Sequence, residues 1–295
     1  PEGIHQPFWS VMIPTYNRTK YLERTLKSVL EQDPGPDEMQ IEVIDNRSTE
    51  DGLEALVSAI GEGRVSFYRQ PTHVSMSDNW TTCIRHAYGR WVHILHDDDM
   101  VMRGFYETYK RFIEEYSEAV MVFCRAIEVD ENDEWVKLMD PPPHWACSGI
   151  VEDGAYKLVE ENFICSTTAV VARDAYVKIG GFASWLNFCA DWEMWMRLAG
   201  IGPIGYLHQP RLLYRVHPDS GTDGFATGAA HRMMTDIVRT IEIGVRRLPA
   251  HLKQRARTEA CKNYAGNAHS VRNSLRDRRL YTSSLQHALW MFRLN

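Results

Sequence analysis

Three consecutive carboxylates, Asp97 to Asp99, directly follow the apolar segment 91–95. That segment is dense in β-branched and aromatic residues, which is typical of a buried strand. Adjacent anions repel one another and raise each other's pKa unless something positive lies close to them. Ligands of open α/β sheets bind at the carboxyl ends of strands, and carboxylates there are suited to a hard divalent cation that in turn holds a phosphate. The run therefore predicts a cation site, with a solvated surface loop as the alternative.

A second carboxylate, Asp45, ends the apolar segment 41–44. In that place it could accept the ring N–H of a uracil, thymine or guanine. The evenly weighted alternative is that this stretch only provides a helix cap, from Ser48 or Thr49. The turn at residues 14–18 has neither the Gly-rich pattern of a dinucleotide-binding turn nor the Gly-Lys pattern that cradles triphosphates. A nucleotide bound here must be held by other groups.

The first hundred residues alternate between short apolar segments and segments with helical periodicity. Strands are predicted at 8–13, 41–44, 65–68 and 91–95, and helices at 19–30, 53–60 and 78–88. Pro14 is expected to break the first strand, and Thr19 to cap the helix that follows. This alternation predicts a largely parallel, doubly wound sheet.

The second half continues less regularly. A helix is predicted at 105–116, a strand at 119–129, an excursion over a sheet edge at 130–149, helices at 154–161 and 174–179 around a strand at 168–172, a helix at 191–198, and two short strands at 205–207 and 212–216. Residues 217–230 are rich in Gly, Ser and Thr and predict a mobile loop. Apolar stripes through Ile237 and Ile241 and through Tyr264 and Val271 predict a helical tail.

Composition places the chain among ordinary globular proteins. Of 295 residues, 44% are hydrophobic and 24% are charged, and no apolar run approaches the length of a membrane span. Six widely spaced cysteines predict reduced thiols and a cytoplasmic protein. No basic-aromatic patch accompanies the charges, so nucleic acid is not an expected partner.

Charge is distributed unevenly along the chain. Residues 239–295 hold 12 Lys and Arg against 3 Asp and Glu, whereas residues 1–238 hold 21 against 36. A solvated outer helical face is the favoured interpretation of the basic tail. The alternative is contact with an anionic substrate or with phospholipid headgroups, which would place the protein at the inner membrane surface.

Four segments together resemble the family-two, inverting nucleotide-sugar glycosyltransferases. They are Val-Met-Ile-Pro-Thr-Tyr-Asn-Arg at 11–18, Val-Ile-Asp-Asn-Arg-Ser-Thr at 43–49, Leu-His-Asp-Asp-Asp at 95–99 and Asp-Trp-Glu-Met-Trp at 191–195. Each segment is degenerate alone, but four in the right order are specific. The resemblance covers about residues 8–220 and implies the GT-A fold, a Rossmann-like, mixed but mostly parallel sheet flanked by helices. It predicts a transferase domain at 1–225, with a nucleotide-sugar half at about 1–100 and an acceptor half at about 101–225, followed by a basic helical extension at 226–295.

The resemblance also implies roles for residues of the donor site. Asp45 would recognise the base, and the adjoining turn would line the base and ribose pocket through Pro14, Thr15, Tyr16 and Asn17. Asp98 would be the principal ligand of a Mn²⁺ or Mg²⁺ ion. Asp99 would assist at the metal, and Asp97 would contact the nucleotide or the sugar. The usual first Asp of this metal-binding element is replaced by His96. Asp78 is expected near the donor's phosphates and sugar.

Further roles follow for residues late in the chain. Asp191 would be the general base that deprotonates the acceptor hydroxyl, with an N-cap role as the alternative. Trp192 would form an acceptor platform, with core packing as an equal alternative. His217 would be a further metal ligand, and Arg215 would neutralise the diphosphate.

The predicted function is metal-dependent, inverting transfer of a sugar from a nucleoside-diphosphate sugar, by default a UDP-sugar, to a hydroxyl of a glycan, lipid-linked or small-molecule acceptor. An inactive, nucleotide-binding regulatory or scaffold protein is the main alternative. A sugar-nucleotide pyrophosphorylase is disfavoured because its Gly-rich turn is absent, and a membrane-surface adaptor is a third interpretation. The striped tail helices predict a contact for a homodimer.

Overall fold

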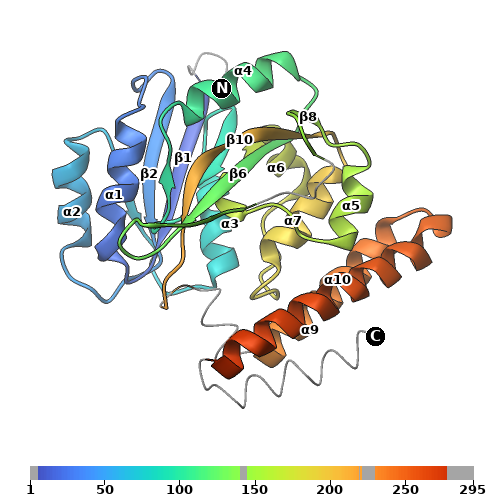
Figure 1. Ribbon diagram of the computed structural model, residues 1–295. Coiled ribbons are helices and arrows are strands. Elements are labelled where there is room, and N and C mark those ends of the chain that lie inside the picture. Colours follow the sequence, from blue (N-terminus) through green and yellow to red (C-terminus); the bar gives the residue numbers. More distant parts are fainter. Residues whose placement is uncertain (1–5, 140–144, 219, 221–229, 278–295) are drawn as a thin grey trace. The chain divides into compact units, whose positions relative to one another are not determined.

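The structure is a computed structural model that describes residues 6–139, 145–218, 220 and 230–277 (Figure 1). It divides into two compact units. The first comprises residues up to 151 together with 164–182 and 201–216, and the second comprises 152–163, 183–200 and the described residues from 217 onward. Among the described residues, no helix combines the length and apolar character that crossing a bilayer requires.

The first unit contains one mixed sheet with the strand order β3-β2-β1-β4-β9-β6-β10-β5. Strands β1, β2, β3 and β4 are mutually parallel, and β6 and β10 are parallel to one another. The remaining strands pair antiparallel, with β7 on β6 and β8 on β10. The strand bounds are β1 (Trp9–Thr15), β2 (Met39–Asp45), β3 (Ser66–Arg69), β4 (Trp91–Ile94), β5 (Met100–Val101), β6 (Met121–Val129), β7 (Trp135–Leu138), β8 (Gly149–Ile150), β9 (Val170–Ala172) and β10 (Ile204–Arg215).

Helices flank this sheet, as the alternation of segments predicts (Figure 1). Their apolar faces complete the hydrophobic core, in which Leu22 and Leu26 of α1 and Phe105 and Tyr109 of α4 are fully buried. The helices of this unit are α1 (Thr19–Leu30), α2 (Leu53–Gly61), α3 (Met76–His86), α4 (Phe105–Glu115) and α6 (Arg173–Ile179), with a 3₁₀ turn, η1, at Ser166–Thr168. The predicted fold class, a mostly parallel GT-A-type sheet with a helical C-terminal region, is confirmed.

The second unit is helical. It contains α5 (Gly154–Glu160), α7 (Ala190–Ala199), α9 (Ala230–Arg247) and α10 (Ala250–Asp277). At Gly244 a Cβ atom would lie 2.5 Å from Sδ of Met196 and 2.8 Å from Cγ2 of Val159, so α9 packs closely on both α7 and α5. The tail helices therefore share a core with two earlier segments, and the domain boundary predicted at residue 225 stays a prediction.

Three local expectations were wrong. Pro14 does not break the first strand, because β1 pairs with β4 only as far as Met12, and beyond that point Pro14 needs no N–H on that side. Thr19 does not cap α1 but donates its hydroxyl to Glu50 Oε2 (3.0 Å). The two short strands predicted at 205–207 and 212–216 are one strand, β10. Its pairing register with β6 shifts on either side of Pro210, so the strand continues past the proline.

Parts of other expectations lie outside the described residues. These are most of the predicted loop at 217–230, residues 140–144 of the predicted excursion, and the side chain of Val271.

Gly89, between α3 and β4, permits a close approach to β1. A Cβ atom there would lie 2.5 Å from the carbonyl carbon of Trp9 and 2.7 Å from the backbone nitrogen of Ser10. Because backbone atoms cannot move aside as a flexible side chain can, we expect Gly89→Ala to lower the free energy of unfolding by about 1–3 kcal/mol or more. Urea unfolding measures this change.

Gly266 in α10 provides the matched control, because a Cβ atom there meets no atom of the described residues within 4 Å. Gly266→Ala is expected to leave stability unchanged or to raise it by about 1 kcal/mol, since alanine favours the helix. Equal effects of the two substitutions would contradict the close approach at Gly89.

Candidate functional site

The acidic run forms a tight turn between β4 and β5. The N–H of Leu95 still donates to the Met12 carbonyl (3.0 Å), and the N–H of Asp99 then donates to the carbonyl of His96 (3.3 Å). The hydroxyl of Thr25, on α1, lies 3.0 Å from the carbonyl oxygen of Asp97 and 2.8 Å from that of Asp99. The backbone of the turn is thus fixed from both sides, and its position at the carboxyl end of β4 is the one predicted.

The three carboxylates are buried rather than solvated. Asp97, Asp98 and Asp99 are 5%, 6% and 0% exposed, so the surface-loop alternative is wrong. Burial, together with the neighbouring Asp98 charge, raises the pKa of Asp97 to about 7. The same two causes raise the pKa of Asp99 well above its ordinary value. The site carries an excess of negative charge that favours binding of a proton or a cation.

Two arginines contact this turn. Arg18 Nη1 lies 2.5 Å from Oδ2 of Asp98 and 3.7 Å from Oδ1 of Asp97. Arg215 is 1% exposed; its backbone N–H donates to Asp99 Oδ1 (2.8 Å), and its Nε donates to the carbonyl oxygen of Asp98 (2.9 Å). The expectation that Arg215 meets a diphosphate is therefore wrong, because its guanidinium is buried and braces the acidic turn.

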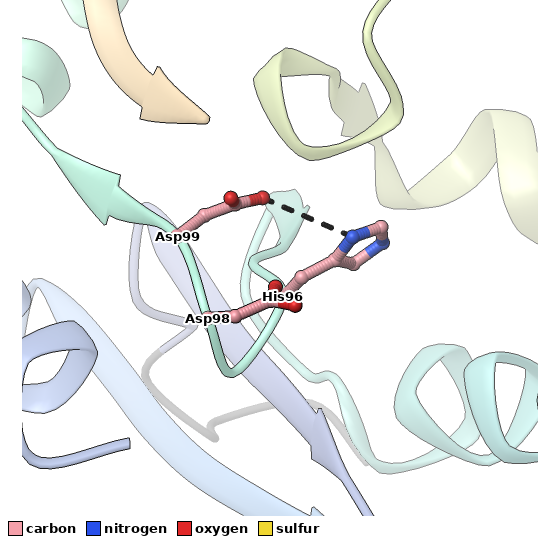
Figure 2. A group of neighbouring side chains, drawn as sticks. All are labelled: His96, Asp98 and Asp99. Carbon is pink, nitrogen blue, oxygen red and sulfur yellow. Dashed lines mark ion pairs between the residues drawn. The ribbon is translucent and has the colours of Figure 1, made fainter. Parts of the chain in front are cut away.

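A group of three side chains within this turn could hold a metal ion. One ligand atom from each of His96, Asp98 and Asp99 lies within 4.8 Å of the other two (Figure 2). Oδ2 of Asp99 is buried and has no hydrogen-bond partner among the described residues, so its lone pairs are available to a cation. One nitrogen and two carboxylate donors fit a divalent ion. We call this group the metal cluster.

The two segments predicted to hold the nucleotide lie side by side, because β1 and β2 are neighbours in the sheet. Asn17 adopts a left-handed backbone conformation (φ 52°), which asparagine tolerates better than most residues. Its N–H donates to Ser48 Oγ (2.9 Å), and its Oδ1 accepts the N–H of Thr49 (2.7 Å). These bonds join the turn after β1 to the turn after β2.

Asp45 is fully buried at the end of β2. Its Oδ1 accepts the N–H of Ser48 (2.9 Å), and its Oδ2 accepts Nε of Arg69 (2.6 Å). The alternative in which Ser48 or Thr49 caps the next helix is wrong, because Gly52 occupies the N-cap position of α2. Contact between Asp45 and a base stays a prediction.

The other predicted nucleotide residues differ in exposure. Pro14 and Thr15 are buried, whereas Tyr16 is 41% exposed, with its ring 4.5 Å from that of His73. Asp78 is exposed in the first turn of α3, where its N–H donates to the N-cap Ser75 hydroxyl oxygen (3.1 Å). A role of Asp78 at the donor's phosphates stays a prediction.

The predicted general base lies in the second unit. Asp191 is the second residue of α7 and is half-buried, and Asn162 Nδ2 donates to its Oδ2 (3.2 Å). Burial raises the pKa of Asp191 to about 6, although backbone N–H groups and Asn162 act in the opposite direction. The N-cap of α7 is Cys189, so the alternative in which Asp191 is the N-cap is wrong. A pKa near 6 suits a base that works at neutral pH.

The loop before α7 is held by the tail. Oδ2 of Asp236, on α9, accepts the N–H groups of Asn187 (2.8 Å) and Phe188 (3.1 Å).

Trp192 is 1% exposed and stacks on Tyr264 with the ring centroids 4.9 Å apart, which supports the core-packing alternative for this tryptophan. By contrast, Trp185 in the same loop is 51% exposed. His217 also belongs to this unit and is 5% exposed. Whether Asp191 and His217 face the metal cluster stays a prediction.

Sequence reasoning assigned no role to three residues that contact the site. Three adjacent carboxylates repel one another and need a nearby positive charge, and this requirement could have indicated Arg18 in the turn after β1. His96 was interpreted only as a replacement of the usual carboxylate, yet it belongs to the metal cluster. Asn162 has no detectable signal, because 29 residues separate it from Asp191.

Arg18 supplies positive charge where a metal ion would bind, which leads to a prediction. We expect Arg18→Gln to lower the free energy of unfolding of the metal-free protein by about 1–2 kcal/mol, because Arg18 is partly exposed and solvent screens its pair with Asp98. Mn²⁺ should then raise the melting temperature of the variant more than that of the wild type. Thermal melting with and without Mn²⁺ measures both effects.

Arg111→Gln is the control, because Arg111 forms a solvent-exposed pair with Glu107 on α4. It should change neither stability nor the Mn²⁺ response appreciably. An Arg18→Gln protein with wild-type melting behaviour would show that Arg18 does not compensate the acidic turn.

Comparison with known proteins identifies relatives of this chain. Of the curated relatives, an uncharacterized protein of Mycobacterium tuberculosis is 27% identical over 204 residues, covering 65% of this chain. The match spans 62% of the mycobacterial protein's own length. An uncharacterized glycosyltransferase of Rickettsia typhi is 20% identical over 223 residues, covering 75% of this chain and 68% of that protein.

Solved structures share the fold. Residues 1–349 of Staphylococcus aureus TarS, in complex with UDP-GlcNAc, superpose with a TM-score of 0.70 at 16% identity, covering 94% of this chain and 79% of that one. The mannosyltransferase PcManGT of Pyrobaculum calidifontis, in complex with GDP-Man and Mn²⁺, has a TM-score of 0.60 at 16% identity, covering 97% of this chain and 87% of that one. The family model "Glycosyl transferase family 2" matches residues 10–180, more than half of the chain. The chain therefore belongs to glycosyl transferase family 2.

Proposed function

We propose that this glycosyltransferase depends on a divalent metal ion and moves a sugar, with inversion, from a nucleoside-diphosphate sugar to a hydroxyl acceptor. The observation that carries the proposal is the metal cluster, a buried group of anions at the carboxyl end of β4 in a family-two chain. Buried charges are retained only where a partner compensates them, and a metal ion with a diphosphate is the partner that this donor set fits.

Separate groups of residues would bind the metal ion, bind the nucleotide and act as the base. Asp98 and Asp99, with His96, would hold the ion, which on binding would supply Lewis-acid neutralisation of the leaving diphosphate. The joined turns after β1 and β2, including Thr15, Tyr16, Asn17 and Asp45, would hold the base and ribose. Asp191 would remove the proton from the acceptor hydroxyl as its oxygen attacks the anomeric carbon from the face opposite the leaving group.

The donor is proposed as a UDP-sugar, and GDP-sugars are the second class to test. TarS was solved with UDP-GlcNAc and PcManGT with GDP-Man, so related folds accept either base. Both uracil and guanine carry a ring N–H that Asp45 could accept. The predicted boundary at residue 225, the membrane contact of the basic tail and the homodimer contact are further proposals for the whole protein.

An inactive, nucleotide-binding relative is the second candidate. The replacement of the usual first carboxylate by His96 favours it, whereas the presence of Asp98, Asp99 and Asp191 favours an enzyme. Hydrolysis or transfer from UDP- and GDP-sugars in the presence of Mn²⁺ distinguishes the two.

Substitution of the two central carboxylates should separate binding from chemistry. We expect Asp98→Asn to lose metal-dependent donor binding, because it removes the principal ligand. Asp191→Asn should keep that binding but lose about 10²–10⁴-fold in transfer rate, the usual contribution of a general base. Titration calorimetry with the donor and Mn²⁺ measures binding, and single-turnover transfer measures the chemistry.

Asp174→Asn is the matched control, since Asp174 is an exposed carboxylate in the first turn of α6. It should leave binding and transfer at wild-type values. Loss of donor binding by Asp191→Asn in parallel with transfer would make Asp191 a structural residue, and unchanged calorimetry for Asp98→Asn would refute its role as a ligand.

The pKa of Asp191 predicts the pH dependence of transfer. A base acts only when ionised, so kcat should fall about tenfold per pH unit as the pH drops below about 6, where Asp191 becomes protonated. The raised pKa also means that ionised Asp191 disfavours folding. The stabilising contribution of the protonated carboxyl group is present below pH 4 and is lost as the pH rises through about 6. Asp191→Asn should therefore be at least as stable as the wild type at pH 8. A kcat that is flat from pH 5 to pH 8 would contradict the assignment.

A further inference from the structure

The metal cluster contains an imidazole where the family resemblance leads us to expect a carboxylate. Nδ1 of His96 lies 3.9 Å from Oδ2 of Asp99, and Figure 2 shows the ring directed at that carboxylate. Two atoms that ligate one ion at about 2.1 Å can lie at most about 4.2 Å apart, so this pair could bind one ion without rearrangement.

The ring of His96 is held in this orientation by its surroundings. It stacks on the indole of Trp80, with the ring centroids 5.2 Å apart and the planes 17° apart. Its backbone N–H donates to the hydroxyl oxygen of Thr167 (3.3 Å), and its Nε2 lies 3.5 Å from Oγ of Ser166. With Nε2 as the N–H donor, the lone pair of Nδ1 points toward Asp99, which is the arrangement that metal-binding histidines usually adopt.

The facing carboxylate oxygen is equally available. Oδ1 of Asp99 accepts the N–H of Arg215 (2.8 Å), whereas its buried Oδ2 has no hydrogen-bond partner among the described residues. A buried carboxylate oxygen left unpaired is costly, and an ion between Oδ2 and Nδ1 would satisfy both atoms. Packing alone explains the stacked ring, but it does not explain why these two atoms face one another.

We propose that His96 is a nitrogen ligand that makes this site select a divalent transition-metal ion, such as Mn²⁺ or Co²⁺, over Mg²⁺. Mg²⁺ strongly prefers oxygen ligands and gives up its water reluctantly. Mn²⁺ also suits oxygen ligands, but it belongs to the transition-metal series whose ions bind mixed nitrogen and oxygen sites, with affinity rising from Mn²⁺ to Co²⁺. This inference rests on the metal site of the proposed function and goes beyond it by naming the class of ion and the residue that selects it.

Pulsed electron paramagnetic resonance of bound Mn²⁺ tests the inference, because a directly coordinated imidazole imposes a ¹⁴N modulation on the signal. Spectra are recorded for the full chain with Mn²⁺ alone and with Mn²⁺ plus UDP or GDP. The wild type should show the modulation, and His96→Asp should lose it while still binding Mn²⁺ through oxygen.

Competition measures the selectivity. Mg²⁺ should displace Mn²⁺ from His96→Asp at a concentration at least about tenfold lower than from the wild type. Losing a hydrogen-bond partner of a metal ligand typically changes metal affinity by about tenfold or more, and losing the ligand itself should change it at least as much. His208→Asn is the control, because His208 lies on β10 with its Nδ1 near the hydroxyl of Tyr206 and is not part of the metal cluster. It should match the wild type in both measurements.

His217, the other histidine predicted as a ligand, provides a decisive comparison. A modulation that disappears in His217→Asn but persists in His96→Asp would overturn the proposal and assign the nitrogen to His217. Bound Mn²⁺ without any ¹⁴N modulation in the wild type would also overturn it, while leaving the metal site and the proposed function intact. Sugar transfer that persists in EDTA, with no Mn²⁺ bound under any condition, would overturn both.

Discussion

The burial of three consecutive carboxylates is the constraint on which the rest of this site depends. Taking charge out of water costs several kcal/mol per ion unless opposite charge or hydrogen bonds compensate it. Here Arg18 contacts the carboxylates themselves, whereas Arg215 and Thr25 bind mainly the backbone of the turn. These contacts hold the acidic turn in place, but within the described part of the chain Oδ2 of Asp99 has no hydrogen-bond partner. The turn is therefore fixed in shape and remains short of positive charge, which suits it to a divalent ion.

The sheet explains how distant segments converge on that constraint. Because β1, β2 and β4 are parallel neighbours, the turns that follow them meet at one edge. Asn17 links the first two turns through its bonds to Ser48 and Thr49, and Arg18, the next residue, contacts the third. The short turn at residues 16–18 thus contacts both the turn after β2 and the acidic turn after β4.

In the second unit, the tail helices support the predicted base rather than forming a separate appendage. Asp236 fixes the backbone of the loop that leads into α7, and Tyr264 accepts the N–H of Asn162, the residue that contacts Asp191. Glu193, two residues after Asp191, is paired with both Arg197 and Arg247. Local ion pairs therefore account for three basic residues of the tail, Arg247, Arg257 and Lys262.

The sequence by itself determined the alternation of strands and helices through the first hundred residues, the fold class and the positions of Asp45 and Asp98 after strands. These features depend on local periodicity and on the rule that ligands gather at the carboxyl ends of parallel strands. The sequence did not predict the short strands β5, β7 and β8. Only the tertiary structure decided which side chains compensate the anions, because charge pairing depends on proximity in space. It buried Arg215 within the acidic turn, placed Arg18 against Asp98 from a turn 80 residues earlier, and brought His96 into the metal cluster. It also grouped α9 and α10 with α5 and α7, since an amphipathic stripe specifies that a face is buried but not which partner covers it.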